Sequence, residues 1–259
     1  MIYRTIDVAQ EDSVRTIRLN RPERRNAMTP EMQLELIAAL DAAGTSDCRV
    51  VVLEGAGETF CSGLDLSVLE NSRGRTSDEY REDAMRTARL FRYLYDLPKA
   101  TIAAVHGAAV AGGAGLATIC DFTLAVPSAK FGFTEARIGF VPALVSAYLR
   151  LQIGDKAARD ILLTGRLFDA TEAQRLGLVT AVVAPEELAN KVRELAATLA
   201  ANSPTSIRAT KRLLAEQNRD WLNEALKLAM EANAHAREMP DFHEGISAFL
   251  EKRKPIWVR

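Results

Sequence analysis

The sequence predicts an α/β fold in which helical crossovers connect buried strands. Three continuous apolar runs are typical of strands covered on both faces: RVVVLEG at 49–55, ATIAAVH at 100–106 and DFTLAV at 121–126. Segments with helical features separate these runs, and strands that alternate with helices favour crossover connections. The chain has 259 residues, of which 48% are hydrophobic, so it is long enough to bury a large core.

The N-terminal elements can be assigned from alternation and from helix caps. Bulky β-formers alternate on either side of a polar turn, which predicts a hairpin with strands at 2–8 and 14–19. Thr29 and Pro30 have the residue types of an N-cap and a first helical position, so a helix is expected from there to about residue 43.

A long helix and a helical C-terminal part complete the pattern. The capping box formed by Thr76 and Glu79 opens a helix that ends before Pro98. After Asp155 the sequence is mostly helical, with LVTAVV at 178–183 as the one predicted strand. The predicted helices are 155–163, 170–176, 186–201, 205–217, 220–236 and 240–251.

Composition argues against several classes of partner. The net charge of −1 provides no field for nucleic acid or an anionic membrane, so we expect neither partner. Residues 100–120 carry no charge, but Ala and Gly dominate them, which disfavours a membrane span. The N-terminus contains acids and lacks an apolar signal core, so a cytoplasmic location is expected.

The cysteines and histidines do not suggest a metal centre. Cys48, Cys61 and Cys120 are odd in number and far apart, which favours reduced thiols. His235 and His243 are eight residues apart rather than the four that place two ligands on one helix face, and no metal is expected.

The stretch VAGGAGLATICD, residues 110–121, has three glycines and almost no titratable group. No Lys follows as in a phosphate-binding loop, and Thr118 stands where a dinucleotide fingerprint needs its third glycine. Two interpretations remain open. The glycines either allow close helix packing, or they let a substrate approach backbone N–H groups that could stabilise an oxyanion.

A second loop, FCSGLDL at 60–66, also follows a buried strand. Together with NRPERRNAM, KATIAAVHGAAVAGGAGLATICDFTLAV, KFGFTEARIGF, LTGRLFDATEAQRLGLV and AFLEKRKP, this loop resembles the crotonase family, also called enoyl-CoA hydratase/isomerase. The resemblance covers nearly the whole chain in the right order.

This resemblance implies a spiral of ββα units at 1–195 and a helical C-terminal oligomerisation region at 196–259. It further implies a homotrimer or hexamer that acts on acyl-CoA thioesters, with coenzyme A entering as part of the substrate and no separate cofactor. By motif position, the backbone N–H groups of Ser62 and Gly112 would form the oxyanion hole, and Glu135 would carry the proton at the α-carbon.

The chain departs from the family pattern at Gly115, which stands where family hydratases have a second glutamate. The base rate of the family favours hydration of a 2-enoyl-CoA. A single glutamate suffices for isomerisation of a 3-enoyl-CoA, so that reaction is the alternative. A non-catalytic CoA-ester-binding or scaffold protein is the alternative of another class.

Further substrate contacts follow from family position. Ala143, Leu144 and Val145 are larger than the residues of many relatives and should reshape the acyl pocket. The residues expected to bind the CoA ester are Arg24, Arg25, Cys61, Gly63, Leu64, Asp65, Phe249 and Lys252.

Overall fold

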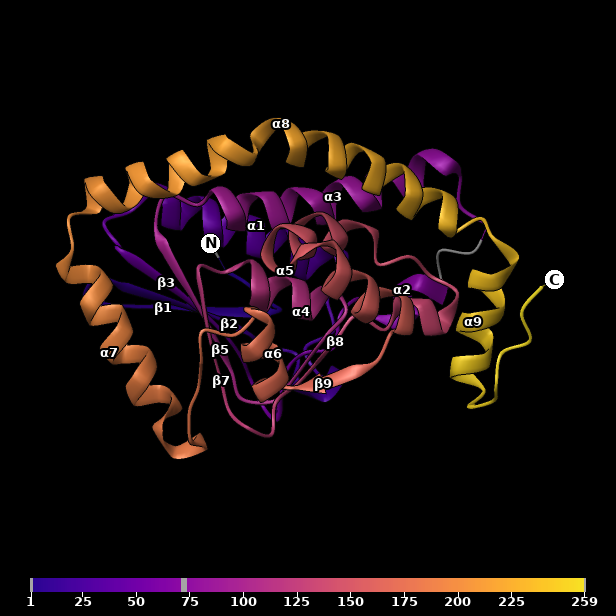
Figure 1. The fold of residues 1–259 in the computed structure, drawn as a ribbon, viewed down its shortest axis with the longest axis horizontal. Coiled ribbons are helices and arrows are strands. Elements are labelled where there is room, and N and C mark those ends of the chain that lie inside the picture. Colours follow the sequence, from indigo (N-terminus) through magenta and orange to yellow (C-terminus); the bar gives the residue numbers. More distant parts are fainter. Residues whose placement is uncertain (1, 71–73, 259) are drawn as a thin grey trace.

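The computed structural model describes residues 2–70 and 74–258, and it contains two sheets among helices (Figure 1). The larger sheet has the order β1-β2-β3-β5-β7-β10. β1 and β2 form an antiparallel hairpin and the other neighbours are parallel, which confirms the α/β prediction. Its strands are β1 (Ile6–Glu11), β2 (Val14–Leu19), β3 (Val50–Gly55), β5 (Ala100–Val105), β7 (Phe122–Ala125) and β10 (Ala181–Val182).

The smaller sheet has the order β4-β6-β8-β9 and was not predicted. Its strands are only three residues long, too short for a periodic signal. β3, β5 and β7 are each followed by a strand of this sheet and then by helical turns, so the chain repeats the expected ββα unit. The strands are β4 (Thr59–Cys61), β6 (Ala108–Val110), β8 (Lys130–Gly132) and β9 (Leu167–Asp169).

Most helices begin and end near their predicted limits. The side chain of Thr29 accepts a hydrogen bond from Met32 N–H at the start of α1 (Pro30–Thr45). Thr76 and Glu79 form the expected capping box at α3 (Ser77–Asp96). The helices α6 (Ala170–Leu176), α7 (Leu188–Ala201) and α9 (Pro240–Leu250) also match, with the turn η3 (Pro185–Glu187) before α7.

Three predicted boundaries were wrong. The helices at 205–217 and 220–236 are one helix, α8 (Pro204–Ala236), because no Gly or Pro interrupts them. The helix at 155–163 is the second half of α5 (Ala143–Thr164), which passes a non-helical Gly154. The first strand starts at Ile6 rather than residue 2, since the N–H groups of Arg4 and Thr5 donate to the Glu35 carboxylate instead of a neighbouring strand.

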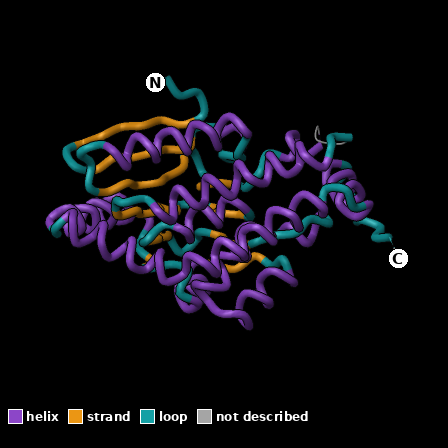
Figure 2. Tube along the Cα trace, turned by 90° about the horizontal axis from the view of Figure 1, so that it is seen from above, coloured by secondary structure: helices purple, strands orange, loops and turns teal. Residues whose placement is uncertain are grey.

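The long helices cover the sheets. α8 packs along α3 and α5, and in Figure 1 it extends over most of the length of the molecule. Figure 2 places the N-terminus beside the long strands and the C-terminus at the opposite end. No helix in residues 2–70 and 74–258 is long and apolar enough to cross a membrane.

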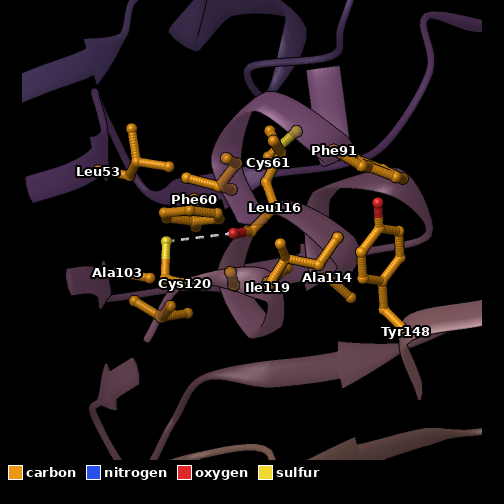
Figure 3. Close-up of a cluster of buried hydrophobic side chains, with 14 of the residues drawn as sticks. Leu53, Phe60, Cys61, Phe91, Ala103, Ala114, Leu116, Ile119, Cys120 and Tyr148 are labelled. Carbon is orange, nitrogen blue, oxygen red and sulfur yellow. Dashed lines mark hydrogen bonds between the residues drawn. The ribbon is translucent and has the colours of Figure 1, made fainter. Parts of the chain in front are cut away.

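The glycine-rich segment forms the buried helix α4 (Gly112–Ile119). Figure 3 shows Phe60 and Cys120 on one side of it and Phe91 and Tyr148 on the other. A Cβ at Gly113 would lie 2.2 Å from the carbonyl oxygen of Cys61, so only glycine lets this helix pack on β4. The close-packing interpretation therefore holds for Gly113.

The C-terminal region folds back on the 3-10 helix η2 (Glu135–Ile138). α9 packs so closely there that a Cβ at Gly245 would lie 2.2 Å from the Ile138 carbonyl oxygen. This contact supports the segment that carries Glu135. The boundary at residues 195 and 196 and the oligomerisation role of 196–259 remain predictions.

Candidate active site

Three parallel strands of the smaller sheet bring the predicted site together. The loop with Ser62 and Leu64 follows β4, Gly112 follows β6, and Glu135 follows β8 after two intervening residues. β4, β6 and β8 are neighbours and run parallel, so their carboxyl ends meet at one edge of the sheet. Residues more than 70 positions apart in sequence thus reach the same place.

The two loops of the expected oxyanion hole touch each other. Gly63 has a φ of +91°, and a Cβ there would lie 2.9 Å from Ala111 Cβ and 3.5 Å from the backbone nitrogen of Gly112. A side chain at 63 would therefore push the loops apart. Glycine is required here both for its backbone angle and for this approach.

The structure contradicts the expected role of the Ser62 N–H group. It already donates to the Arg25 carbonyl oxygen at 3.1 Å, because the loop pairs with residues 25–28. The N–H groups of Gly63 and Asp65 are also occupied, by the Cys61 sulfur and the Met28 carbonyl oxygen. Sequence reasoning could not see this pairing, which depends on the packing of two distant loops.

Leu64 has a backbone N–H that is left without an acceptor among the described residues. Its parallel bridge to Met28 uses the Gly63 carbonyl and the Asp65 N–H, so the N–H of Leu64 itself points to the opposite edge. That edge faces α4, because Gly63 contacts Ala111 and Gly112. The sequence placed Leu64 only in the CoA pocket.

Gly112 offers a second such N–H group as the first residue of α4. The N–H groups of a first helical turn have no acceptor within their own helix. The preceding Ala111 has φ 51° and ψ −125°, a conformation that costs a non-glycine residue about 1–3 kcal/mol. The Ala111 N–H donates a hydrogen bond to the Gly132 carbonyl oxygen at 2.7 Å. This bond and the strained backbone of Ala111 set the direction of the Gly112 N–H.

Glu135 is buried, with 8% of its surface exposed, and its Oε2 atom has no hydrogen-bond partner. Burial raises the pKa of this carboxyl group to about 7, and the hydrogen bond from its own backbone N–H opposes the rise only in part. A carboxyl group that titrates near neutral pH can both accept and donate a proton. The role of Glu135 as the proton carrier stays a prediction.

A cavity of about 1120 Å³ connects these groups. Besides Glu135, its lining contains the predicted residues Arg24, Arg25, Ser62, Leu64, Asp65, Gly112, Ala143, Leu144, Val145 and Phe249. Cys61, Gly63, Gly115 and Lys252 do not line it. The expected direct contacts of Cys61, Gly63 and Lys252 with a CoA ester are therefore not supported.

Cys61 and Asp65 have structural partners. The Cys61 thiol donates to the Asn26 carbonyl at 3.2 Å, and burial raises its pKa to about 12, so it is a poor nucleophile. Asp65 accepts hydrogen bonds from Ser67 at the start of α2 (Leu66–Glu70) and pairs with Arg21 at 3.0 Å. Burial opposes ionisation of Asp65, but these hydrogen bonds outweigh it and lower its pKa.

The space beside Gly115 is already filled. A Cβ there would lie 2.8 Å from Val145 Cγ1 and 3.0 Å from Phe91 Cζ. The other acids that line the cavity do not replace the missing carboxylate, since Asp65 is paired and the rest are exposed: Glu23, Glu58 and Glu70. Glu135 is therefore the one buried and unpaired acid in the lining formed by the described residues.

Two further cavity residues were missed by the sequence analysis, Asn233 and Arg237. Both lie at the end of α8, four residues apart, and both are at most 5% exposed. A charged and an amide residue on a mostly polar helix are usually surface residues, so the sequence contained no signal for them.

Within 2–70 and 74–258, no three His, Cys, Asp or Glu residues are grouped to hold a metal ion. The three cysteines are free and buried.

One cavity thus holds a buried carboxyl group and two backbone N–H groups that have no acceptor among the described residues. On repeated ββα units, this combination defines an enzyme class that abstracts or delivers a proton next to a carbonyl group. The family model for enoyl-CoA hydratase/isomerase matches residues 9–259. The chain belongs to this family, the crotonase family.

Relatives and solved structures agree over nearly the full length. A provisionally named enoyl-CoA hydratase of Thermus thermophilus is 46% identical, with 95% of this chain and 98% of the relative covered. The crotonyl-CoA hydratase of Syntrophomonas wolfei is 32% identical over 100% of this chain and 99% of its own. A crystal structure of an enoyl-CoA hydratase/isomerase from Xanthobacter autotrophicus is 31% identical, with a TM-score of 0.90 over 96% of this chain and 94% of that one.

Proposed function

We propose that the protein converts acyl-CoA thioesters through an enolate, and that its main reaction is reversible addition of water to a 2-enoyl-CoA. The single observation that carries this proposal is the buried, unpartnered Glu135 in the same cavity as two backbone N–H groups without an acceptor among the described residues. The thioester oxygen would accept hydrogen bonds from Leu64 and Gly112, which stabilise the negative charge of the enolate. Leu64 thus replaces Ser62 in the proposed oxyanion hole.

Glu135 alone can carry out both proton transfers that hydration requires. Its carboxylate accepts a proton from water as the water oxygen bonds to C3, and the electron pair of the double bond moves into the enolate. The protonated carboxyl group then donates that proton to C2. A pKa near 7 suits both steps, because the two protonation states are close in free energy at neutral pH.

Isomerisation of a 3-enoyl-CoA is the second candidate, and the Gly115 site favours it. Glu135 would take a proton from C2 of the 3-enoyl ester and return it to C4, which leaves the double bond between C2 and C3. No second carboxylate is needed, and Val145 and Phe91 occupy its space. Among the relatives, a peroxisomal Δ(3,5)-Δ(2,4)-dienoyl-CoA isomerase of Arabidopsis thaliana is 31% identical over 99% of this chain.

Mass spectrometry of the products separates these candidates. The protein is mixed separately with a short 2-enoyl-CoA and a short 3-enoyl-CoA, and Glu135→Gln is the control. Gain of one water by the 2-enoyl ester supports the hydratase proposal. Conversion of the 3-enoyl ester at constant mass, without water gain, supports the isomerase. If neither ester reacts but both bind, the non-catalytic alternative is favoured.

We further propose a homotrimer or hexamer in the cytoplasm, with coenzyme A supplied only by the substrate. Free, buried Cys48, Cys61 and Cys120 are in keeping with a reducing compartment. Arg24, Arg25 and Phe249 line the cavity and are our candidates for contact with the CoA part.

A further inference from the structure

The cavity contains a cluster of charged and amide groups that the proposed reaction does not use. Arg237 is 2% exposed, lines the cavity, and has an Nε atom without a hydrogen-bond partner. Asn233, one helical turn earlier, is 5% exposed, lines the same cavity, and has an Oδ1 atom without a partner. Buried polar atoms are nearly always hydrogen-bonded, so two orphaned groups on one cavity wall indicate a missing polar ligand.

The charge of this cluster is strongly unbalanced. Asp83 on α3 is the shared partner of Arg75 at 3.0 Å, Arg237 at 3.1 Å and Arg86. Three guanidinium groups share this one carboxylate, and only that of Arg237 is buried, since the side chains of Arg86 and Arg75 are 20% and 36% exposed. The nearby Glu79 is exposed and is engaged in the capping box with Thr76. A buried positive charge of this kind is stabilised by an anion that also accepts its free donors.

The guanidinium group of Arg237 is held rigidly. It lies over the rings of Tyr80 and Phe140, 5.8 and 5.6 Å from their centroids. Burial lowers the pKa of Arg237 while Asp83 opposes this. The ion pair of Arg237 at 3.1 Å is with Asp83, and Glu135 Oε2 has no hydrogen-bond partner. The proposed catalytic carboxylate and Arg237 are therefore not an ion pair, and both can interact with one ligand.

The spacing along α3 indicates how far the cluster lies from the reacting carbonyl. Phe91 Cζ lies 4.0 Å from the position of a Cβ at Gly112 and 3.0 Å from that of a Cβ at Gly115. Thr87 lines the cavity one turn earlier, and Asp83 lies one turn before that. Eight residues of helix span about 12 Å. Hydrogen bonds of about 3 Å at each end leave about 6 Å, the reach of about five carbon atoms joined by bonds near 1.5 Å.

We propose that Arg237 and Asn233 bind a carboxylate at the far end of the acyl chain, so that the preferred substrate is the CoA thioester of a short dicarboxylic acid. The carboxylate accepts hydrogen bonds from the guanidinium group and from the Asn233 amide, whose oxygen and nitrogen can exchange places by rotation. This inference rests on the proposed function for the position of the thioester. It goes beyond that proposal by naming the class of acyl group.

Equilibrium binding of saturated thioesters tests the inference without catalysis. Glutaryl-CoA and pentanoyl-CoA have the same chain length and differ in the terminal carboxylate, and their dissociation constants are measured by calorimetry. A charge-assisted hydrogen bond to a buried arginine should make glutaryl-CoA bind about 10-fold or more tightly. Equal affinities would overturn the inference, whereas failure of both thioesters to bind would instead contradict the proposed function.

Three variants locate the effect. Arg237→Met leaves Asp83 with Arg75 and Arg86, so the fold should survive, and the preference for glutaryl-CoA should fall to about 2-fold or less. Arg75→Gln is the matched control: it also loses an Asp83 ion pair, but Arg75 does not line the cavity, so the preference should persist.

Asn233→Asp keeps the size of the side chain and adds a negative charge, so it should weaken glutaryl-CoA binding while pentanoyl-CoA binding stays nearly constant. Because it does not touch an ion pair, this variant keeps the inference testable if Arg237→Met does not fold. Circular dichroism checks each variant. Unchanged preference in folded Arg237→Met or Asn233→Asp protein would refute the role of that residue.

Discussion

Replacing Glu135 by Gln should remove the proposed catalytic function and stabilise the protein at neutral pH. The carboxyl group is buried and unpartnered, and its pKa is raised from 4.5 to about 7. Between these values the folded state binds more protons than the unfolded state, so stability falls as the pH rises. At about 1.36 kcal/mol for each pKa unit, this rise in the pKa of Glu135 lowers the free energy of unfolding by about 3 kcal/mol once the carboxyl group is ionised.

The stabilising effect of Glu135 in its protonated form is fully present below about pH 4.5 and is lost as the pH rises to about 7. Glutamine resembles the protonated carboxyl group and cannot ionise. The variant should therefore match the native protein near pH 4.5 and be more stable by about 3 kcal/mol at pH 8.

Urea unfolding at a series of pH values and one fixed protein concentration measures this difference. Other carboxylates also contribute to the pH dependence of stability. Their contributions cancel when the free energy of unfolding of the native protein is subtracted from that of the variant. Glu186→Gln, which removes an exposed carboxylate, controls for the loss of one negative charge. A stability difference that does not change between pH 4.5 and 8 would refute the buried, high-pKa description of Glu135.

The same variant tests catalysis. Loss of a group that transfers the proton should lower the turnover rate by about 10²-fold or more, with CoA-ester binding nearly unchanged. An active Glu135→Gln protein would remove this residue from the proposed mechanism.

Further predictions concern the backbone and the filled carboxylate site. Gly112→Pro deletes one proposed oxyanion donor and should raise the activation free energy of turnover by about 3 kcal/mol. Thermal melting checks that the variant folds, and normal activity in a folded variant would exclude Gly112 as a donor. Gly115→Glu should destabilise the protein by about 1–3 kcal/mol through contact with Val145, and adding Val145→Gly should restore stability and raise hydration relative to isomerisation, as product analysis would show. Ala111→Gly should relieve the positive φ and raise the melting temperature; an unchanged or lower melting temperature would contradict strain at Ala111. Light scattering should give the mass of three or six chains; a monomer would contradict the proposed assembly.

The sequence alone predicted much of the fold because its signals are local. Thr29 and Thr76 cap the helices that they were expected to cap, and the uninterrupted apolar runs became the central strands. Glu135 and Gly112 were selected by resemblance, and both line the cavity. The prediction of one helix as two, 205–217 and 220–236, shows the limit of assigning helix ends where no Gly or Pro marks them.

Only the tertiary structure determined which distant segments pair and pack against one another. Three-residue strands carry no periodic signal, yet their parallel pairing gathers three loops at one edge and thereby creates the site. The Ser62 N–H donates to the Arg25 carbonyl, and the Leu64 N–H has no acceptor among the described residues. Both facts follow from the pairing register of two loops. Arg237 and Asn233 reach the cavity only because α8 packs along α3, so their burial, orphaned atoms and proposed role depend on packing that no local pattern encodes.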